Sequence, residues 1–219
     1  MGGAGAGKST GWLNIALLSA QTGSDARFYV LDSDDAVAVM LARDAQWANL
    51  TNIEVFGARE WENYTKATDQ ILGRIRPNDW FIGDFVSTAW DAVQEWYVER
   101  IYGKTDMGQY FMDAREANKK AALDGWKDYS VINRVYRTWS NKIQFDMPSH
   151  VYLTAEAETV RDTDERELKK LFYQFGVRPK GQKHLTYTVH TVLLFQTDGR
   201  GGYFMNTAKD RGRERMTHS

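Results

Sequence analysis

Short apolar runs alternate with longer amphipathic stretches along the first two thirds of the chain. Four runs have the length and nearly continuous apolar character of buried parallel strands, at residues 27–31, 52–56, 79–84 and 150–154. The stretches beside them predict helices, at residues 12–18, 36–42, 61–75, 88–102 and 129–143. Strands that alternate with helices predict an α/β domain with a mostly parallel sheet flanked by helices.

The remaining segments add to this single predicted domain, which spans residues 1–219. Residues 103–125 are polar and predict a helical insert, whereas residues 157–183 are charged and predict a loop or lid. Two further apolar runs, at 188–195 and 202–206, predict closing strands around a glycine-rich turn.

Composition excludes several classes of protein. The chain has 219 residues, of which 42% are hydrophobic and 13% aromatic, enough for one sizeable core. With no cysteine, it has no disulfide scaffold, Cys-ligated zinc site or thiol nucleophile. Its apolar runs are shorter than the roughly 18 residues of a membrane span, so we expect no membrane partner and a cytoplasmic location, in the host if the protein is viral.

Charge is unevenly distributed although the net charge is only −1. Residues 25–99 contain 6 basic and 14 acidic residues, whereas residues 176–219 contain 8 basic and 3 acidic ones. The basic C-terminal region could contact the phosphates of a nucleotide or of DNA, or it could be a solvated surface.

A glycine-rich motif at the N-terminus is the most specific signal. The pattern G-x-x-x-x-G-K-[ST] is met by Gly2, Gly7, Lys8 and Ser9, and an amphipathic helix follows directly. Glycines allow the backbone to wrap a polyphosphate, whose charge is favoured by the N–H groups and dipole of the helix. The motif predicts a P-loop that binds ATP and Mg²⁺ through Gly2, Gly3, Ala4, Gly5, Ala6, Gly7, Lys8, Ser9 and Thr10.

Each polar member of the loop has an expected role. Lys8 would neutralise the β- and γ-phosphates, the Ser9 hydroxyl would bind Mg²⁺, and Thr10 would reach the α-phosphate. Such a loop normally follows a buried strand, yet only Met1 precedes the glycines here. We therefore expect the first strand of the sheet to be missing from this sequence.

A carboxylate at the end of a neighbouring strand would complete the Mg²⁺ site. Asp84 ends the run at residues 79–84 and is our candidate for that metal-associated carboxylate. Alternatively, Asp84 caps the helix that follows, a task that Ser87 could also perform.

The order of these pieces resembles the core of the RecA-like ATPases. The similarity extends from Gly2 to Arg215 and is closest to compact phage-type members, some of them associated with single-strand annealing recombination. Its late part rests on residues 178–183, 188–195 and 208–211. The resemblance implies ATP hydrolysis in DNA recombination, repair or genome handling, and assembly into a ring or filament.

The resemblance also assigns roles by position. Asp34 matches the carboxylate that polarises the attacking water, although Asp32 or Asp35 could serve instead. Glu156 matches a polar sensor of the γ-phosphate. Lys209 and Arg211 match basic residues that reach a neighbouring subunit's γ-phosphate. Simpler interpretations stay open, since the aspartates could cap a helix and Glu156, Lys209 and Arg211 could be solvated.

Other interpretations of the whole chain also remain. Single-stranded DNA could be bound by Lys180, Lys183 and Arg200, with Tyr187 for stacking. A P-loop kinase acting on a small molecule would use residues 160–170 as a lid, with Arg161 and Arg166. A non-catalytic nucleotide-binding module is the third alternative.

Overall fold

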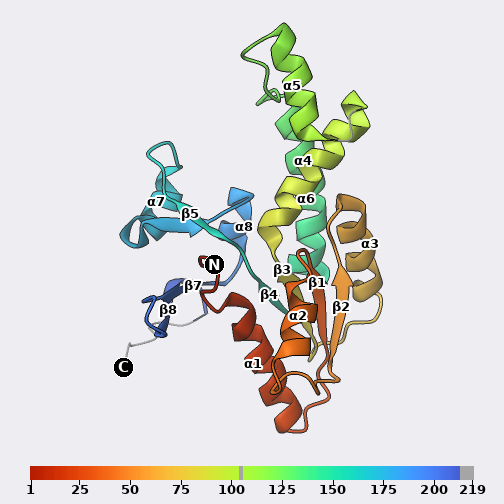
Figure 1. Ribbon diagram of the computed structural model, residues 1–219, viewed down its shortest axis with the longest axis vertical. Coiled ribbons are helices and arrows are strands. Elements are labelled where there is room, and N and C mark those ends of the chain that lie inside the picture. Colours follow the sequence, from red (N-terminus) through yellow and green to blue (C-terminus); the bar gives the residue numbers. More distant parts are fainter. Residues whose placement is uncertain (104–105, 213–219) are drawn as a thin grey trace.

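A four-stranded parallel sheet forms the centre of the protein. The computed structural model describes residues 1–103 and 106–212, so Arg215 lies outside the described residues. The strands are β1 (Phe28–Asp32), β2 (Ile53–Gly57), β3 (Trp80–Asp84) and β4 (His150–Leu153), in the order β2-β1-β3-β4 (Figure 1). All three pairings are parallel, which confirms the predicted sheet.

Helices cover both faces of the sheet because successive strand residues point to opposite sides. Phe28, Val30 and Ile82 pack against α1 (Lys8–Gln21) and α2 (Ala36–Arg43). Tyr29, Leu31 and Phe81 belong to the larger cluster on the other face. That face is covered by the helices α3 (Trp61–Leu72), α4 (Val86–Tyr102) and α6 (Asp128–Asn141).

Aromatic side chains fill the space between α3, α4 and α6. Trp61, Tyr64, Tyr136 and Trp139 are all buried, and their ring centroids lie 5.4–6.4 Å apart in the contacting pairs. Trp139 Nε1 also donates a hydrogen bond to Thr68 Oγ1 at 2.8 Å. The face predicted from the spacing within residues 129–143 therefore packs into the core.

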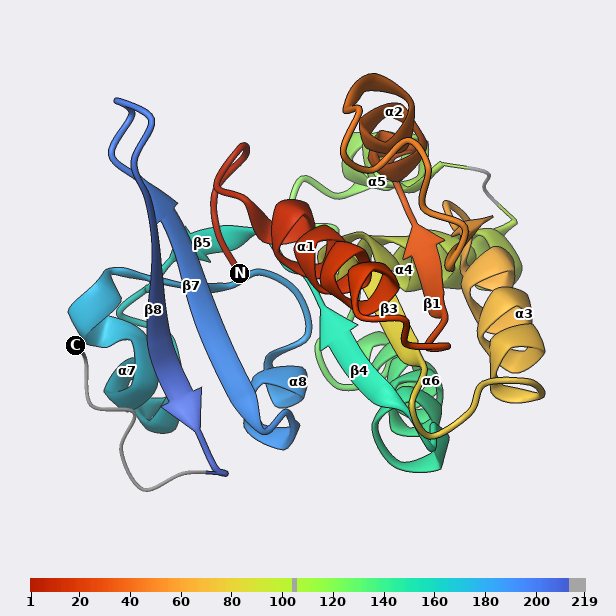
Figure 2. The same cartoon turned by 90° about the horizontal axis from the view of Figure 1, so that it is seen from below.

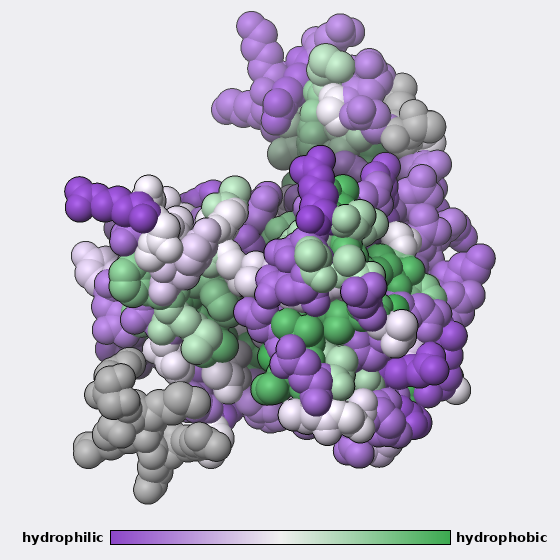
Figure 3. All heavy atoms as spheres, turned by 60° about the horizontal axis from the view of Figure 1, so that its bottom comes forward, coloured by the Kyte–Doolittle hydropathy of each residue, from purple (hydrophilic) through white to green (hydrophobic). Residues whose placement is uncertain are grey.

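The polar insert projects from the end of α4 and contains α5 (Met107–Ala117) (Figure 1). Its side chains are mainly hydrophilic in the view of Figure 3, and α5 buries none of its residues. The buried Asp128 carboxylate anchors the base of the insert, since it accepts hydrogen bonds from the Tyr97 and Tyr102 hydroxyls at 2.8 and 3.1 Å. The π-helical turn η1 (Lys142–Asp146) extends α6 towards β4.

Residues after β4 form a second group of elements. They are β5 (Ala157–Thr159), α7 (Arg166–Phe172), η2 (Tyr173–Phe175), β6 (Val177–Pro179), α8 (Lys183–Thr188), β7 (Thr191–Thr197) and β8 (Tyr203–Asp210). The pairs β5–β6 and β7–β8 are antiparallel. Within the charged segment 157–183, α7 buries Leu168 and Phe172.

Met1 and Gly2 connect the two groups of elements. Gly2 forms parallel bridges to Glu156 on one side and to Phe195 in β7 on the other. Its N–H donates to Ala155 O, its carbonyl accepts from Ala157 N, and Phe195 N donates to Met1 O at 2.8 Å. Figure 2 shows the N-terminus between β4 and β7, where these residues occupy the place of a strand. Across the described residues, no helix is long and apolar enough to cross a membrane.

Candidate functional site

The glycine-rich loop folds into a turn at the start of α1. Gly5 and Gly7 have φ angles of 68° and 90°, a region that favours glycine. Within the described part of the chain, the N–H groups of Gly5, Gly7, Lys8, Ser9 and Thr10 make no hydrogen bond. Unpaired N–H groups at a helix N-terminus form a site for phosphate oxygens.

The Lys8 side chain lies back over this loop. Its ammonium donates to Gly2 O at 3.0 Å and to Gly3 O at 2.8 Å, and the residue is 5% exposed. The ammonium also lies 4.9 Å from the centre of the Phe85 ring. Burial lowers the pKa of Lys8, whereas the charges of Asp84, Glu156 and Asp34 raise it. Three of the carboxylates singled out from the sequence therefore act on the charge of Lys8.

Asp84 is buried at the carboxyl end of β3. One of its oxygens accepts from Trp12 Nε1 of α1 at 3.2 Å, and the other accepts from the Thr154 hydroxyl. The register of the parallel sheet places Asp84 opposite Asp32 at the same edge. Each carboxylate oxygen has a second lone pair free, so Asp84 can still accept a bond from a metal-bound water.

The three aspartates after β1 have different surroundings. Asp32 is buried and accepts bonds from Val37 N and Asp34 N at 3.1 and 3.4 Å. Burial and the hydrogen bond with Asp34 raise the pKa of Asp32 to about 6. Asp35 pairs with Arg59. Asp34 is exposed and is the member of this trio whose charge acts on Lys8.

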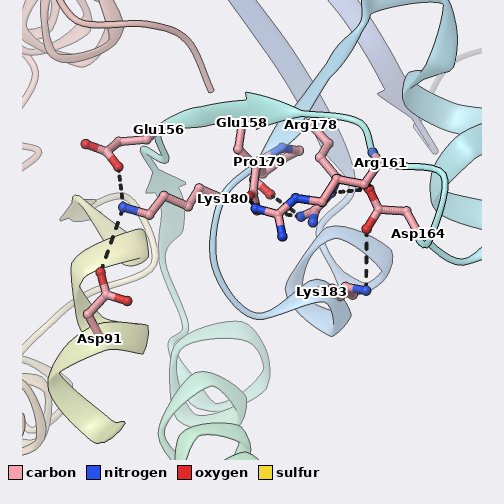
Figure 4. A network of polar contacts seen from close by, with 9 residues as sticks. All are labelled: Asp91, Glu156, Glu158, Arg161, Asp164, Arg178, Pro179, Lys180 and Lys183. Atoms are coloured by element: carbon pink, nitrogen blue, oxygen red, sulfur yellow. Dashed lines mark hydrogen bonds and ion pairs between the residues drawn. The ribbon is translucent and has the colours of Figure 1, made fainter. Parts of the chain in front are cut away.

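Glu156 lies directly beside the P-loop backbone. It is the bridge partner of Gly2, and its carboxylate accepts from Lys180 Nζ at 2.8 Å. Lys180 also lies 3.9 Å from Asp91 of α4 (Figure 4). Sequence reasoning placed Lys180 among the DNA contacts, but its ammonium faces these two carboxylates.

Lys209 and Arg211 contact the end of α8. Lys209 Nζ donates to the carbonyls of Thr186, Tyr187 and Val189 at 2.9, 2.9 and 2.6 Å, and Arg211 donates to Tyr187 O at 2.6 Å. Burial and the charge of Arg211 lower the pKa of Lys209. Cations stabilise the carbonyl end of a helix. Their action on a neighbouring subunit stays a prediction.

A groove of about 1000 Å³ lies between α6 and α8. Lys183 and Tyr187, two of the four DNA candidates, line it, whereas Arg200 lies in the turn between β7 and β8. Arg134 and Arg137 of α6 also line the groove, and neither guanidinium has a partner among the described residues. Neither arginine is among the residues predicted from the sequence, although their spacing of three puts them on one helix face.

The residues present fit Mg²⁺ bound together with a nucleotide. The Ser9 hydroxyl makes no hydrogen bond within the described ranges, and it begins the same helix as the free N–H groups. Across those ranges no group of three or more His, Cys, Asp or Glu side chains could hold a metal alone. Mg²⁺ usually takes one or two protein ligands and completes its shell with phosphates and water.

Comparisons with known proteins agree with this architecture. No protein-family model and no curated protein matches the chain. A solved structure, described as the crystal structure of the RadB recombinase, is similar with a TM-score of 0.51 and 13% identity. The match covers 97% of this chain and 80% of the RadB chain. The chain therefore has the RecA-like α/β fold of a recombinase structure.

Proposed function

We propose that this protein binds and hydrolyses ATP with Mg²⁺ at the P-loop. The observation that supports the proposal best is the row of unpaired N–H groups beside a buried lysine whose ammonium lies over the loop, bonded to the Gly2 and Gly3 carbonyls. An anionic ligand would satisfy the N–H groups, and Lys8 would exchange its bonds with the Gly2 and Gly3 carbonyls for bonds with phosphate.

Each of the remaining residues would have a separate role in phosphoryl transfer. The hydroxyl of Ser9 would hold Mg²⁺, while Asp84 would accept a bond from a metal-bound water. Bound Mg²⁺ would neutralise charge on the β- and γ-phosphate oxygens. Asp34, exposed just after β1, would orient the attacking water, and Asp32 would hold the turn through the bonds that it accepts from Val37 N and Asp34 N.

Steady-state hydrolysis of Mg-ATP tests this proposal. We expect turnover by the intact chain and loss of at least about 100-fold in Lys8→Ala, because phosphate charge then lacks its cation. Lys66→Ala removes an exposed lysine from α3 and is the matched control, with turnover unchanged. Equal turnover in Lys8→Ala and the intact chain would contradict a P-loop mechanism.

DNA binding is the second part of the proposal, and the groove between α6 and α8 supports it. The groove combines Arg134 and Arg137, which have no partner among the described residues, with the half-buried ring of Tyr187. Cations beside aromatic rings suit single-stranded nucleic acid, whose backbone is charged and whose bases stack. Glu165 is the acidic side chain of the lining and accepts a bond from the Tyr187 hydroxyl at 3.2 Å.

Binding of a labelled oligothymidylate, followed by fluorescence anisotropy, tests the groove. Arg134→Ala/Arg137→Ala should weaken binding and lower the slope of log K against log salt by about 1.4, since each lost phosphate contact removes about 0.7. Arg43→Ala/Lys66→Ala removes the same charge from α2 and α3 and serves as the control. Equal weakening in both variants would mean that net charge, not the groove, drives binding.

We further propose that the protein is a phage-type RecA-like ATPase, similar to those associated with single-strand annealing recombination. In a ring or filament, Lys209 and Arg211 would have to leave the α8 carbonyls before reaching a neighbouring nucleotide. ATP turnover that rises with single-stranded DNA would favour this role. Turnover that requires a small acceptor would favour the kinase instead, and nucleotide binding without turnover would favour a binding module.

A further inference from the structure

The surroundings of Glu156 present a problem for ATP binding. Glu156 is the bridge partner of Gly2, whose carbonyl accepts a hydrogen bond from Lys8 Nζ at 3.0 Å, so it also lies near the proposed place of the phosphates. A carboxylate beside a triphosphate is repelled unless a cation stands between them. Lys8 and Mg²⁺ would both act on the charge of the phosphates themselves, so a further cation is needed beside Glu156.

Lys180 is placed to supply this charge. Its backbone N–H donates to Glu156 O at 2.8 Å, and Glu156 in turn is the bridge partner of Gly2. The three backbones therefore lie side by side, in the order Gly2, Glu156, Lys180. Figure 4 shows the Lys180 side chain extended from the end of β6 towards Glu156 and Asp91.

The Lys180 ammonium is held but not enclosed. It binds Glu156 at 2.8 Å and lies 3.9 Å from Asp91, and 43% of its side chain is exposed. The hydrogen bond with Glu156 raises its pKa, so the ammonium stays charged at neutral pH. A flexible lysine between two carboxylates can turn towards a third anion at small cost.

Its neighbours along the chain lack this freedom. Arg178 is buried and binds Asp164 and Glu158 at 2.8 and 2.7 Å, while Lys183 lies 3.4 Å from Asp164 (Figure 4). Both cations already bind carboxylates of β5 or of the segment between β5 and α7. Lys180, in contrast, binds Glu156, which is the bridge partner of Gly2 in the P-loop.

We propose that Lys180 contacts the γ-phosphate of ATP bound to the same chain, and that Glu156 and Asp91 position it. The inference rests on the proposed nucleotide site and adds a γ-phosphate ligand that comes from the end of β6. On ATP binding the ammonium would be shared between Glu156 and a γ-phosphate oxygen. ADP lacks that oxygen, so the pair distinguishes ATP from ADP.

Calorimetric titration with Mg-AMP-PNP and Mg-ADP separates this contact from the rest of the site. Lys180→Met should weaken AMP-PNP binding roughly 10-fold or more, the size of one charge-assisted hydrogen bond, and leave ADP binding unchanged. Lys66→Met removes an exposed lysine from α3, is the matched control and should bind both nucleotides normally. Equal AMP-PNP affinity in Lys180→Met and the intact protein would overturn the contact.

A double variant distinguishes contact from simple neutralisation of Glu156. In Lys180→Met/Glu156→Gln the repelling carboxylate is also removed. We expect AMP-PNP binding to stay weak, because the γ-phosphate still lacks its cation. Recovery to the affinity of the intact protein would show that Lys180 only masks Glu156, and would overturn the proposal. Absence of binding of both nucleotides to the intact protein would instead reject the nucleotide site itself.

Discussion

The central sheet with its helices and the group of elements after β4 differ in what they bury. Between the sheet and its helices lie apolar side chains such as Phe28, Ile82 and Trp12, all fully buried. The sheet region also buries the carboxylates of Asp32, Asp79 and Asp84, whereas the later elements bury both partners of an ion pair, since Arg178 and Asp164 are 4% and 5% exposed and bind each other at 2.8 Å. Apolar packing tolerates many sequences, whereas a buried ion pair requires both partners.

This difference decides how each part responds to mutation. Loss of an apolar side chain costs the free energy of its burial and of the cavity that remains. Loss of one partner of a buried pair leaves an uncompensated charge, and a second substitution can remove that cost. The proposed site residues come from both parts: Lys8 begins α1, Asp34 follows β1 and Asp84 ends β3, whereas Glu156 and Lys180 come after β4.

Phe81→Ala should give the largest loss of stability. Phe81 is fully buried in β3 within the larger apolar cluster, so truncation leaves a cavity under α3, α4 and α6. We expect the free energy of unfolding to fall by about 3–5 kcal/mol in urea denaturation. Leu18→Ala is the control, because Leu18 is 60% exposed on α1 and should change stability by less than about 0.5 kcal/mol. Similar losses in both variants would contradict the assigned core.

Arg178→Met should come next, with a loss of about 3 kcal/mol. Burial alone would raise the pKa of Asp164. The hydrogen bonds from Arg178 and from the Arg161 N–H outweigh this effect, and the pKa falls from 3.8 to about 2. Without Arg178 the buried carboxylate loses its buried cation and keeps only the Arg161 N–H at 2.8 Å and the half-exposed Lys183 at 3.4 Å. Arg178→Met/Asp164→Asn should therefore recover part of the loss, measured by the same urea titration. A double variant less stable than the single one would contradict the importance of the pair.

Asp32→Asn tests a smaller, pH-dependent effect. Because the pKa of Asp32 is raised from 3.8 to about 6, the folded protein binds more protons than the unfolded chain between these values. Stability should therefore fall as pH rises from about 4 to 6, by about 2 kcal/mol in total. Asp32→Asn should remove this fall in a series of urea titrations. An unchanged pH profile would show that Asp32 is ionised throughout.

Much of the sheet and of the P-loop could be predicted from local sequence. The apolar runs predicted the four parallel strands correctly, because strands buried on both faces carry few polar residues. The helical spacing of Ile132, Tyr136 and Trp139 placed α6 on the core. The predicted P-loop residues run without interruption from the bridges of Gly2 into the first turn of α1, because they are adjacent in the sequence.

The contacts made over long sequence separations could not be predicted. Lys180 was assigned to DNA because it belongs to a basic stretch, yet pairing of β5 with β6 turns it towards Glu156. Arg134 and Arg137 were overlooked because only the fold brings α8 opposite α6. Nothing local marks Lys209 and Arg211 as partners of the α8 carbonyls, about twenty residues away along the chain.

Isothermal calorimetry of Mg-ATP binding, with the intact chain and with Lys8→Ala, tests the central claim most directly. The account predicts saturable binding with a stoichiometry of about one and a loss of at least about 10-fold in affinity for Lys8→Ala. Equal affinity in the two proteins, or no binding to the intact chain, would contradict a nucleotide site at the P-loop.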